Sequence, residues 1–248
     1  MELASQGAQL KPISFWHSTA LFTIPGIIFC FLYLYLFEFL LDKGFTHGDT
    51  MVAVNIIGLP GLLALALYLY RREGNVFQWQ AFKRRMRIKP MDKKTWGFTL
   101  IAVIINIGGY LGFFVITVEL INGRISLPTW AIQPTDTGPV VGMYSLIVIH
   151  FLLLLLNVFS EEILWRGYIL PRQELQHGKR AWWIHGLQWT WFHLIFKPWE
   201  LLMLLPGCLA ISWVCSKTKN TTPGLIVHLA LNGLGVIMVS LAVFGIIG

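Results

Sequence analysis

Long apolar stretches dominate the chain, and they constrain its fold more than any other feature of the sequence. The first runs from residue 13 to residue 41 and contains a single carboxylate, Glu38. A helix needs about 20 residues to cross the hydrocarbon core of a bilayer. Backbone groups within lipid must also be hydrogen-bonded inside the spanning segment. With 56% hydrophobic and 12% charged residues, the chain is predicted to be an all-α polytopic transmembrane bundle.

Seven spans are predicted, and a short helix at residues 77–86 or after Pro171 would make eight helices. The fourth span is longer than a membrane requires and is expected to stop at Pro171. A polar loop, residues 122–139, separates an N-terminal part (1–139) from a catalytic core (140–248) within one integrated membrane domain. The predicted spans cover residues 13–41, 51–70, 96–121, 140–170, 182–196, 201–215 and 224–247.

The basic residues predict the orientation of the bundle. Residues 71–94 alone contain nine Lys or Arg, and with a cytoplasmic N-terminus fifteen of the nineteen basic residues fall on the cytoplasmic side. The positive-inside rule favours this arrangement. The expected location is the plasma membrane of a prokaryote, with the N-terminus in the cytoplasm. The cytoplasmic basic residues account for most of the net charge of +7, and residues 71–94 are interpreted as a basic loop next to anionic lipid. No nucleic-acid partner is expected.

Glu161, Glu162 and Arg166 lie at the end of an apolar run, where burial of a charge costs several kcal/mol unless it is offset. Residues four apart share a face of a helix, so Glu162 and Arg166 are expected to form a structural ion pair. Glu161 points about 100° away from Glu162 around the helix axis and has no such partner. One carboxylate is therefore expected to be structural and the other available for chemistry.

Three further polar residues lie within predicted spans, and one of them, His193, lies at a depth similar to that of Glu161. His193 is about eleven residues into the fifth span, and His228 and Asn232 share one face of the seventh. A carboxylate beside an imidazole can deprotonate water, and an imidazole with an amide can stabilise an oxyanion. His150, Asn157 and His185 are interpreted as structural or interfacial residues.

The same side chains leave a metal site open as an alternative. Glu161, His193 and His228 offer one oxygen and two nitrogen ligands, which would suit a catalytic zinc ion. The sequence has no HExxH motif, however. No cofactor is expected, with zinc as the alternative.

Three motifs in this order resemble the CAAX protease and bacteriocin-processing family of intramembrane proteases, also called the Abi family, which includes Rce1-type prenyl-protein endopeptidases. They are "EEILWR" from Glu161 to Arg166, "WTWFH" ending at His193, and "HLALN" from His228 to Asn232. The resemblance covers about residues 140–248. In the second motif the chain has Trp189 where the family usually has Phe.

The resemblance implies a role for each matching position. Glu161 would be the general base, His193 would help to orient the attacking water, and Glu162 would pair with Arg166. His228 and Asn232 would form the oxyanion site. The expected function is hydrolysis of a peptide bond in a protein or peptide tail reached from the cytoplasmic side. Some family members act on prenylated substrates, but nothing in this sequence selects them.

Two non-enzymatic functions remain as alternatives. A bacteriocin-immunity or membrane scaffold protein could keep the family motifs without catalysis. A transporter could use the same buried carboxylates, but the outer halves of the spans are mostly Leu, Ile, Val and Phe, which disfavours a polar path.

Overall fold

The computed structural model describes residues 10–120, 140–194 and 198–246. The predicted loop at 122–139, and the predicted span ends at residues 121, 195–196 and 247, lie outside these ranges. The described elements are α1 (Phe15–Phe31), the π-helical η1 (Leu32–Phe37), α2 (Glu38–Asp42), α3 (His47–Arg72), α4 (Trp79–Arg85), α5 (Lys93–Leu120), α6 (Ser145–Glu162), the π-helical η3 (Ile163–Ile169), α7 (Leu170–His177), the 3₁₀-helical η4 (Gly178–Arg180), α8 (Ala181–Phe192), α9 (Pro198–Thr218) and α10 (Thr222–Val243).

The predicted all-α fold is confirmed, because the described residues form helices and no strand. Both short helices that were considered are present, as α4 near residues 77–86 and α7 around Pro171. Six helical stretches in the described part are long and apolar enough to cross a membrane, which makes this an integral membrane protein. They are Phe15–Asp42, Gly48–Arg72, Lys93–Ile116, Ser145–Phe192, Glu200–Thr218 and Thr222–Val243.

The fourth and fifth predicted spans differ from the expectation. Pro171 does not end the helical stretch, because it lies in the first turn of α7, where a missing N–H leaves no bond unmade. The chain instead bends through η3 and α7 into α8. The twelve residues of α8 extend about 18 Å, too short to cross the bilayer alone. The helix ends at its C-cap residue, His193.

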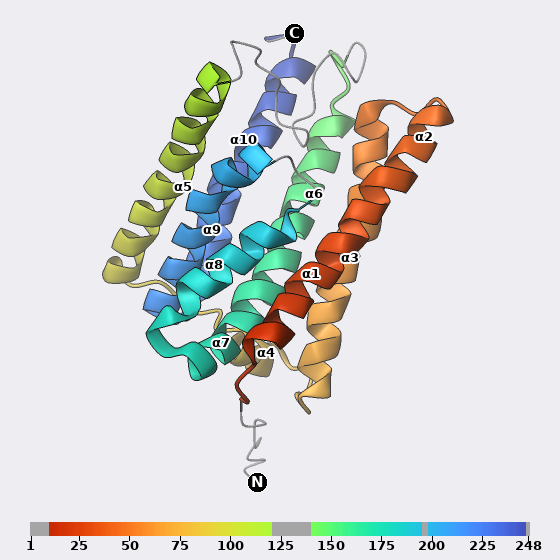
Figure 1. The fold of residues 1–248 in the computed structure, drawn as a ribbon. Coiled ribbons are helices and arrows are strands. Elements are labelled where there is room, and N and C mark those ends of the chain that lie inside the picture. The colour runs from red at the N-terminus through yellow and green to blue at the C-terminus, as the bar shows by residue number, and fades with distance from the viewer. Residues whose placement is uncertain (1–9, 121–139, 195–197, 247–248) are drawn as a thin grey trace.

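The helices form one bundle with two distinct ends (Figure 1). We call the end where α1 begins, and where α4 and α7 lie, the lower end, and the end where α10 finishes the upper end. Helix α9 packs against α5, α8 and α10, and α6 packs against α3 and α10. Small residues permit close contact: a Cβ added to Gly186 of α8 would lie 3.0 Å from Cα of Leu209 in α9.

A cluster of charges ties several elements together at the lower end. Glu73, at the C-cap of α3, accepts hydrogen bonds from Arg85 Nε at 2.6 Å and from Arg172 Nε at 3.1 Å. Arg85 also donates to the carbonyl oxygen of Gly167 in η3, at 3.0 Å. Arg172 donates to the carbonyl oxygen of Lys11, at 2.8 Å. One carboxylate therefore links α3 to α4 and α7 and, through the two arginines, to η3 and the chain before α1.

We predict that Glu73→Gln lowers stability at neutral pH by about 1 to 2 kcal/mol, since hydrogen bonds to charged groups are lost. Desolvation by itself would raise the pKa of Glu73, but Arg85 and Arg172 outweigh it and hold the pKa below its ordinary value of 4.5. A carboxylate with a lowered pKa stabilises the fold above that ordinary value, and the contribution disappears as the pH falls through the lowered pKa. The gap between wild type and Glu73→Gln should therefore close below about pH 4.5.

Thermal unfolding in detergent, followed over a range of about pH 3 to 8, measures this gap. Asp42→Asn is the matched control, because Asp42 is exposed at the end of α2. An equal loss of stability in both variants, or a gap that does not change with pH, would contradict the linking role of Glu73.

Candidate active site

Glu161 and Glu162 are adjacent at the lower end of α6, and their exposed fractions are only 4% and 0%. A carboxylate buried this deeply needs hydrogen-bond donors. The next helical turn supplies them, four residues on: Trp165 donates to Glu161 and Arg166 donates to Glu162. Two neighbouring carboxylates therefore have different partners, one a neutral indole and the other a cation.

Glu162 is held in a sealed cluster of charged groups. Its Oε1 accepts from Arg166 Nη1 at 2.9 Å and from His228 Nδ1 of α10 at 2.9 Å. The guanidinium of Arg166 lies over the ring of Trp189 in α8, 3.4 Å from the ring centroid. Such contacts offset the cost of burying two charges, and they join η3 and α6 to α8 and α10.

Glu161 has no ion pair among the described residues. Its Oε2 accepts from the indole Nε1 of Trp189 at 2.7 Å and from that of Trp165 at 3.3 Å. Its Oε1 has no hydrogen-bond partner within the described ranges. The two indole donors fix the carboxylate group while leaving one oxygen available for a reacting molecule.

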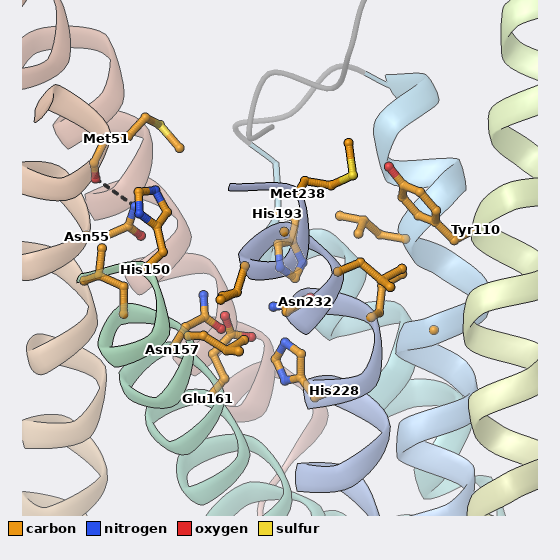
Figure 2. Close-up of a pocket in the computed structure, with 18 of the residues that line it drawn as sticks. Met51, Asn55, Tyr110, His150, Asn157, Glu161, His193, His228, Asn232 and Met238 are labelled. Carbon is orange, nitrogen blue, oxygen red and sulfur yellow. Dashed lines mark hydrogen bonds between the residues drawn. The ribbon is translucent and has the colours of Figure 1, made fainter. Parts of the chain in front are cut away.

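A cavity of about 590 Å³ lies against Glu161. His193 at the end of α8, and His228 and Asn232 on α10, also line it, so all four residues predicted to be catalytic reach one cavity. Figure 2 shows Glu161 on one side and the other three facing it from the opposite side. Glu162 and Arg166 do not line the cavity. Glu161 is therefore accessible from the cavity, whereas Glu162 is not.

Hydrogen bonds orient both histidine rings. His193 Nδ1 lies 2.9 Å from the carbonyl oxygen of Trp189, and a carbonyl can only accept, so Nδ1 carries a proton. His228 Nδ1 likewise lies 2.9 Å from Oε1 of Glu162, an oxygen that also accepts from Arg166, so His228 Nδ1 carries a proton. A neutral ring then has its lone pair at Nε2. His228 can therefore donate from Nε2 to an oxyanion only as an imidazolium.

The ligand set considered for zinc is not assembled. In the described part of the chain, no three His, Cys, Asp or Glu side chains form a group that could hold a metal ion. Glu161, His193 and His228 line the same cavity, but they do not come together there as a group that could hold a metal ion. The residues present do not fit a preformed zinc site.

Some residues of the site were not recognised from the sequence. His185 is buried, and its Nδ1 lies 2.6 Å from Gln173 Oε1. It does not line the cavity, in keeping with a structural residue. His150 and Asn157, interpreted in the same way, instead line the cavity. The available signal was their helical spacing from Glu161, because positions four and eleven residues before it share its face. The same spacing applies to Trp165, four residues after Glu161, whereas the donor Trp189 lies on another helix and had no such signal.

Part of the chain matches a known protein family. Residues 143–234 match the family model described as type II CAAX prenyl endopeptidase, Rce1-like. All three motifs lie within the matched segment, so the resemblance that they predicted is confirmed over these residues. This segment is thus similar to a family of proteases. No curated protein and no solved structure matches the chain significantly.

We predict that Gly224→Ala disrupts the sealed cluster. An added Cβ would lie 2.4 Å from Glu162 Oε2 and 2.7 Å from Cys215 Sγ. Because Arg166 and His228 hold Glu162, it cannot move away cheaply, and overpacking should cost about 1 to 3 kcal/mol.

Thermal unfolding of Gly224→Ala against Gly233→Ala measures the effect on one helix. A Cβ at Gly233 meets open space, so its change should be neutral or slightly stabilising through helix propensity. Equal melting temperatures for the two variants would contradict the tight contact at Glu162.

Proposed function

We propose that the protein is an intramembrane endopeptidase in which Glu161 activates water to hydrolyse a peptide bond. One observation carries the proposal. Glu161 is a buried carboxylate that has no ion pair among the described residues and lines a cavity, whereas its neighbour Glu162 is sealed by Arg166 and His228. Burying a carboxylate without a counter-ion costs free energy. Such a residue at membrane depth therefore marks a candidate functional site. The family match supports proteolysis in general.

In the proposed reaction, Glu161 removes a proton from water while the water oxygen attacks the scissile carbonyl carbon. The carbonyl electron pair moves to its oxygen and forms a tetrahedral oxyanion. When this intermediate collapses, the C–N bond breaks and the proton held by Glu161 passes to the leaving amine. The products are an amine and a carboxyl group, and Glu161 is regenerated.

Three other residues would assist this step. His193 would accept a hydrogen bond from the attacking water through Nε2 and so orient it. The amide of Asn232 would donate to the oxyanion. His228 would contribute a second donor in its imidazolium form, with its Nδ1 proton directed at Glu162.

We propose a peptide or protein substrate, prenylated or not, in a bundle whose lower, basic end faces the cytoplasm. The location would be the plasma membrane of a prokaryote, with lipid as the surrounding partner. The cavity extends from Glu161 toward the upper end, with Met51 and Ala242 among its lining, and all seven residues of η3 are buried. These features favour access from within the membrane, unlike the cytoplasmic access expected from the sequence.

We predict that Glu161→Gln lowers peptide cleavage at least about a hundredfold, because a glutamine cannot act as a general base. Cleavage of a peptide library by protein in liposomes, read by mass spectrometry, measures the loss. Glu38→Gln is the matched control, since Glu38 is exposed on α2 and does not line the cavity. Both variants should keep the wild-type melting temperature within a few degrees.

A strong chelator in the same assay separates the two chemical mechanisms. Cleavage by wild type should not change. Loss of cleavage with chelator and recovery with zinc would favour the metal mechanism and overturn the role assigned to Glu161. Full cleavage by Glu161→Gln would also overturn it. A folded wild type that cleaves nothing would favour the immunity or scaffold alternative.

A further inference from the structure

Three polar residues follow one face of α6 into the cavity. Glu161, Asn157 and His150 all line it, together with leucines between them. At about 100° per residue, Asn157 and His150 lie within about 40° of Glu161 around the helix. At 1.5 Å per residue they lie about 6 Å and 16 Å above it. Figure 2 shows the three labelled side chains one above another on this helix.

Two atoms of this row are buried and have no hydrogen-bond partner: Oδ1 of Asn157 and Nε2 of His150. His150 Nδ1 lies 2.7 Å from the carbonyl oxygen of Leu146, so Nδ1 carries the proton and Nε2 of the neutral ring is an acceptor. The amide oxygen of Asn157 is also an acceptor. The row therefore presents two unsatisfied acceptors, and leaving such atoms buried without a partner is costly.

We propose that Asn157 and His150 form a substrate subsite that binds backbone N–H groups of an extended, apolar peptide segment. This inference rests on the proposed function and names the class of its substrate. An extended chain advances about 3.3 Å per residue, so a segment running along α6 from Glu161 would pass Asn157 about two residues from the scissile bond. It would pass His150 about five residues from that bond.

The chemistry of the row favours a peptide over a hydrocarbon chain. The rest of the lining is mostly apolar, which suits apolar side chains. A peptide inside a membrane cavity must find partners for its backbone N–H groups, and the two acceptors supply them. A prenyl chain would fill the same space, but it has no N–H group and would leave both acceptors unpaired. Asn157 and His150 are thus positioning residues for the substrate.

The test uses a library of apolar peptides in which one backbone amide at a time is replaced by an ester, which removes the N–H and little else. Wild type, Asn157→Leu, His150→Leu and Asn55→Leu are reconstituted in phosphatidylcholine vesicles, and products are sequenced by mass spectrometry. Asn55 is the matched control, because it lines the same cavity but its Nδ2 already donates to the carbonyl oxygen of Met51, at 2.8 Å. Retention of uncleaved peptides by Glu161→Gln vesicles is measured in parallel.

For wild type and Asn55→Leu, we expect peptides with an ester about two residues from the scissile bond to be cleaved about five- to tenfold less. Asn157→Leu should cleave these ester peptides as well as the all-amide peptides. His150→Leu should lose the corresponding discrimination against an ester about five residues from the scissile bond. A merely structural role for either residue would not produce such position-dependent coupling. Cleavage by wild type without any discrimination, or with the same discrimination in Asn157→Leu, overturns the subsite.

The parallel binding measurement separates the two proposals. One outcome is that wild type cleaves nothing while Glu161→Gln vesicles retain peptides, and the ester two residues along weakens this retention only while Asn157 is present. In that case the subsite stands and the protease function falls. If peptides are neither cleaved nor retained, both proposals fail.

Discussion

The structure depends on how one membrane-buried carboxylate is neutralised. Glu162 lies at zero exposure and receives hydrogen bonds from Arg166 and His228, and Arg166 packs on Trp189. Removing one partner from such a buried pair typically costs about 3 to 5 kcal/mol. The cluster therefore fixes the positions of η3, α8 and α10 relative to α6. It also places His228 and Asn232 beside the cavity that Glu161 faces.

The difference between the two glutamates comes from adjacent helical positions. Each carboxylate meets the side chain four residues later, which is Trp165 for Glu161 and Arg166 for Glu162. An indole holds a carboxylate in place without neutralising it, whereas a guanidinium forms an ion pair. A one-residue step along the chain thus separates a group that maintains the fold from a group with an oxygen open to the cavity.

The helical fold and the pairing of Glu162 with Arg166 could be predicted from the sequence because both depend on local spacing. Apolar length predicted the spans, and the four-residue spacing indicated which glutamate would meet Arg166. Other features depend on packing between helices. The bond from His228 to Glu162 joins residues 66 positions apart, and the α8 helix stops at His193 rather than crossing the bilayer. The position of Asn157 against the cavity could not be predicted, because it depends on how the neighbouring helices pack around α6.

In the proposed mechanism Glu161 activates water and does not itself attack the substrate. Single-turnover cleavage in ¹⁸O-labelled water, with protein in excess over peptide, tests this most directly. If Glu161 activates water, the new carboxyl group of the product should contain one ¹⁸O atom in the first turnover. An unlabelled product carboxyl group would mean that its oxygen came from Glu161 through a covalent intermediate, which would contradict the activation of water by Glu161.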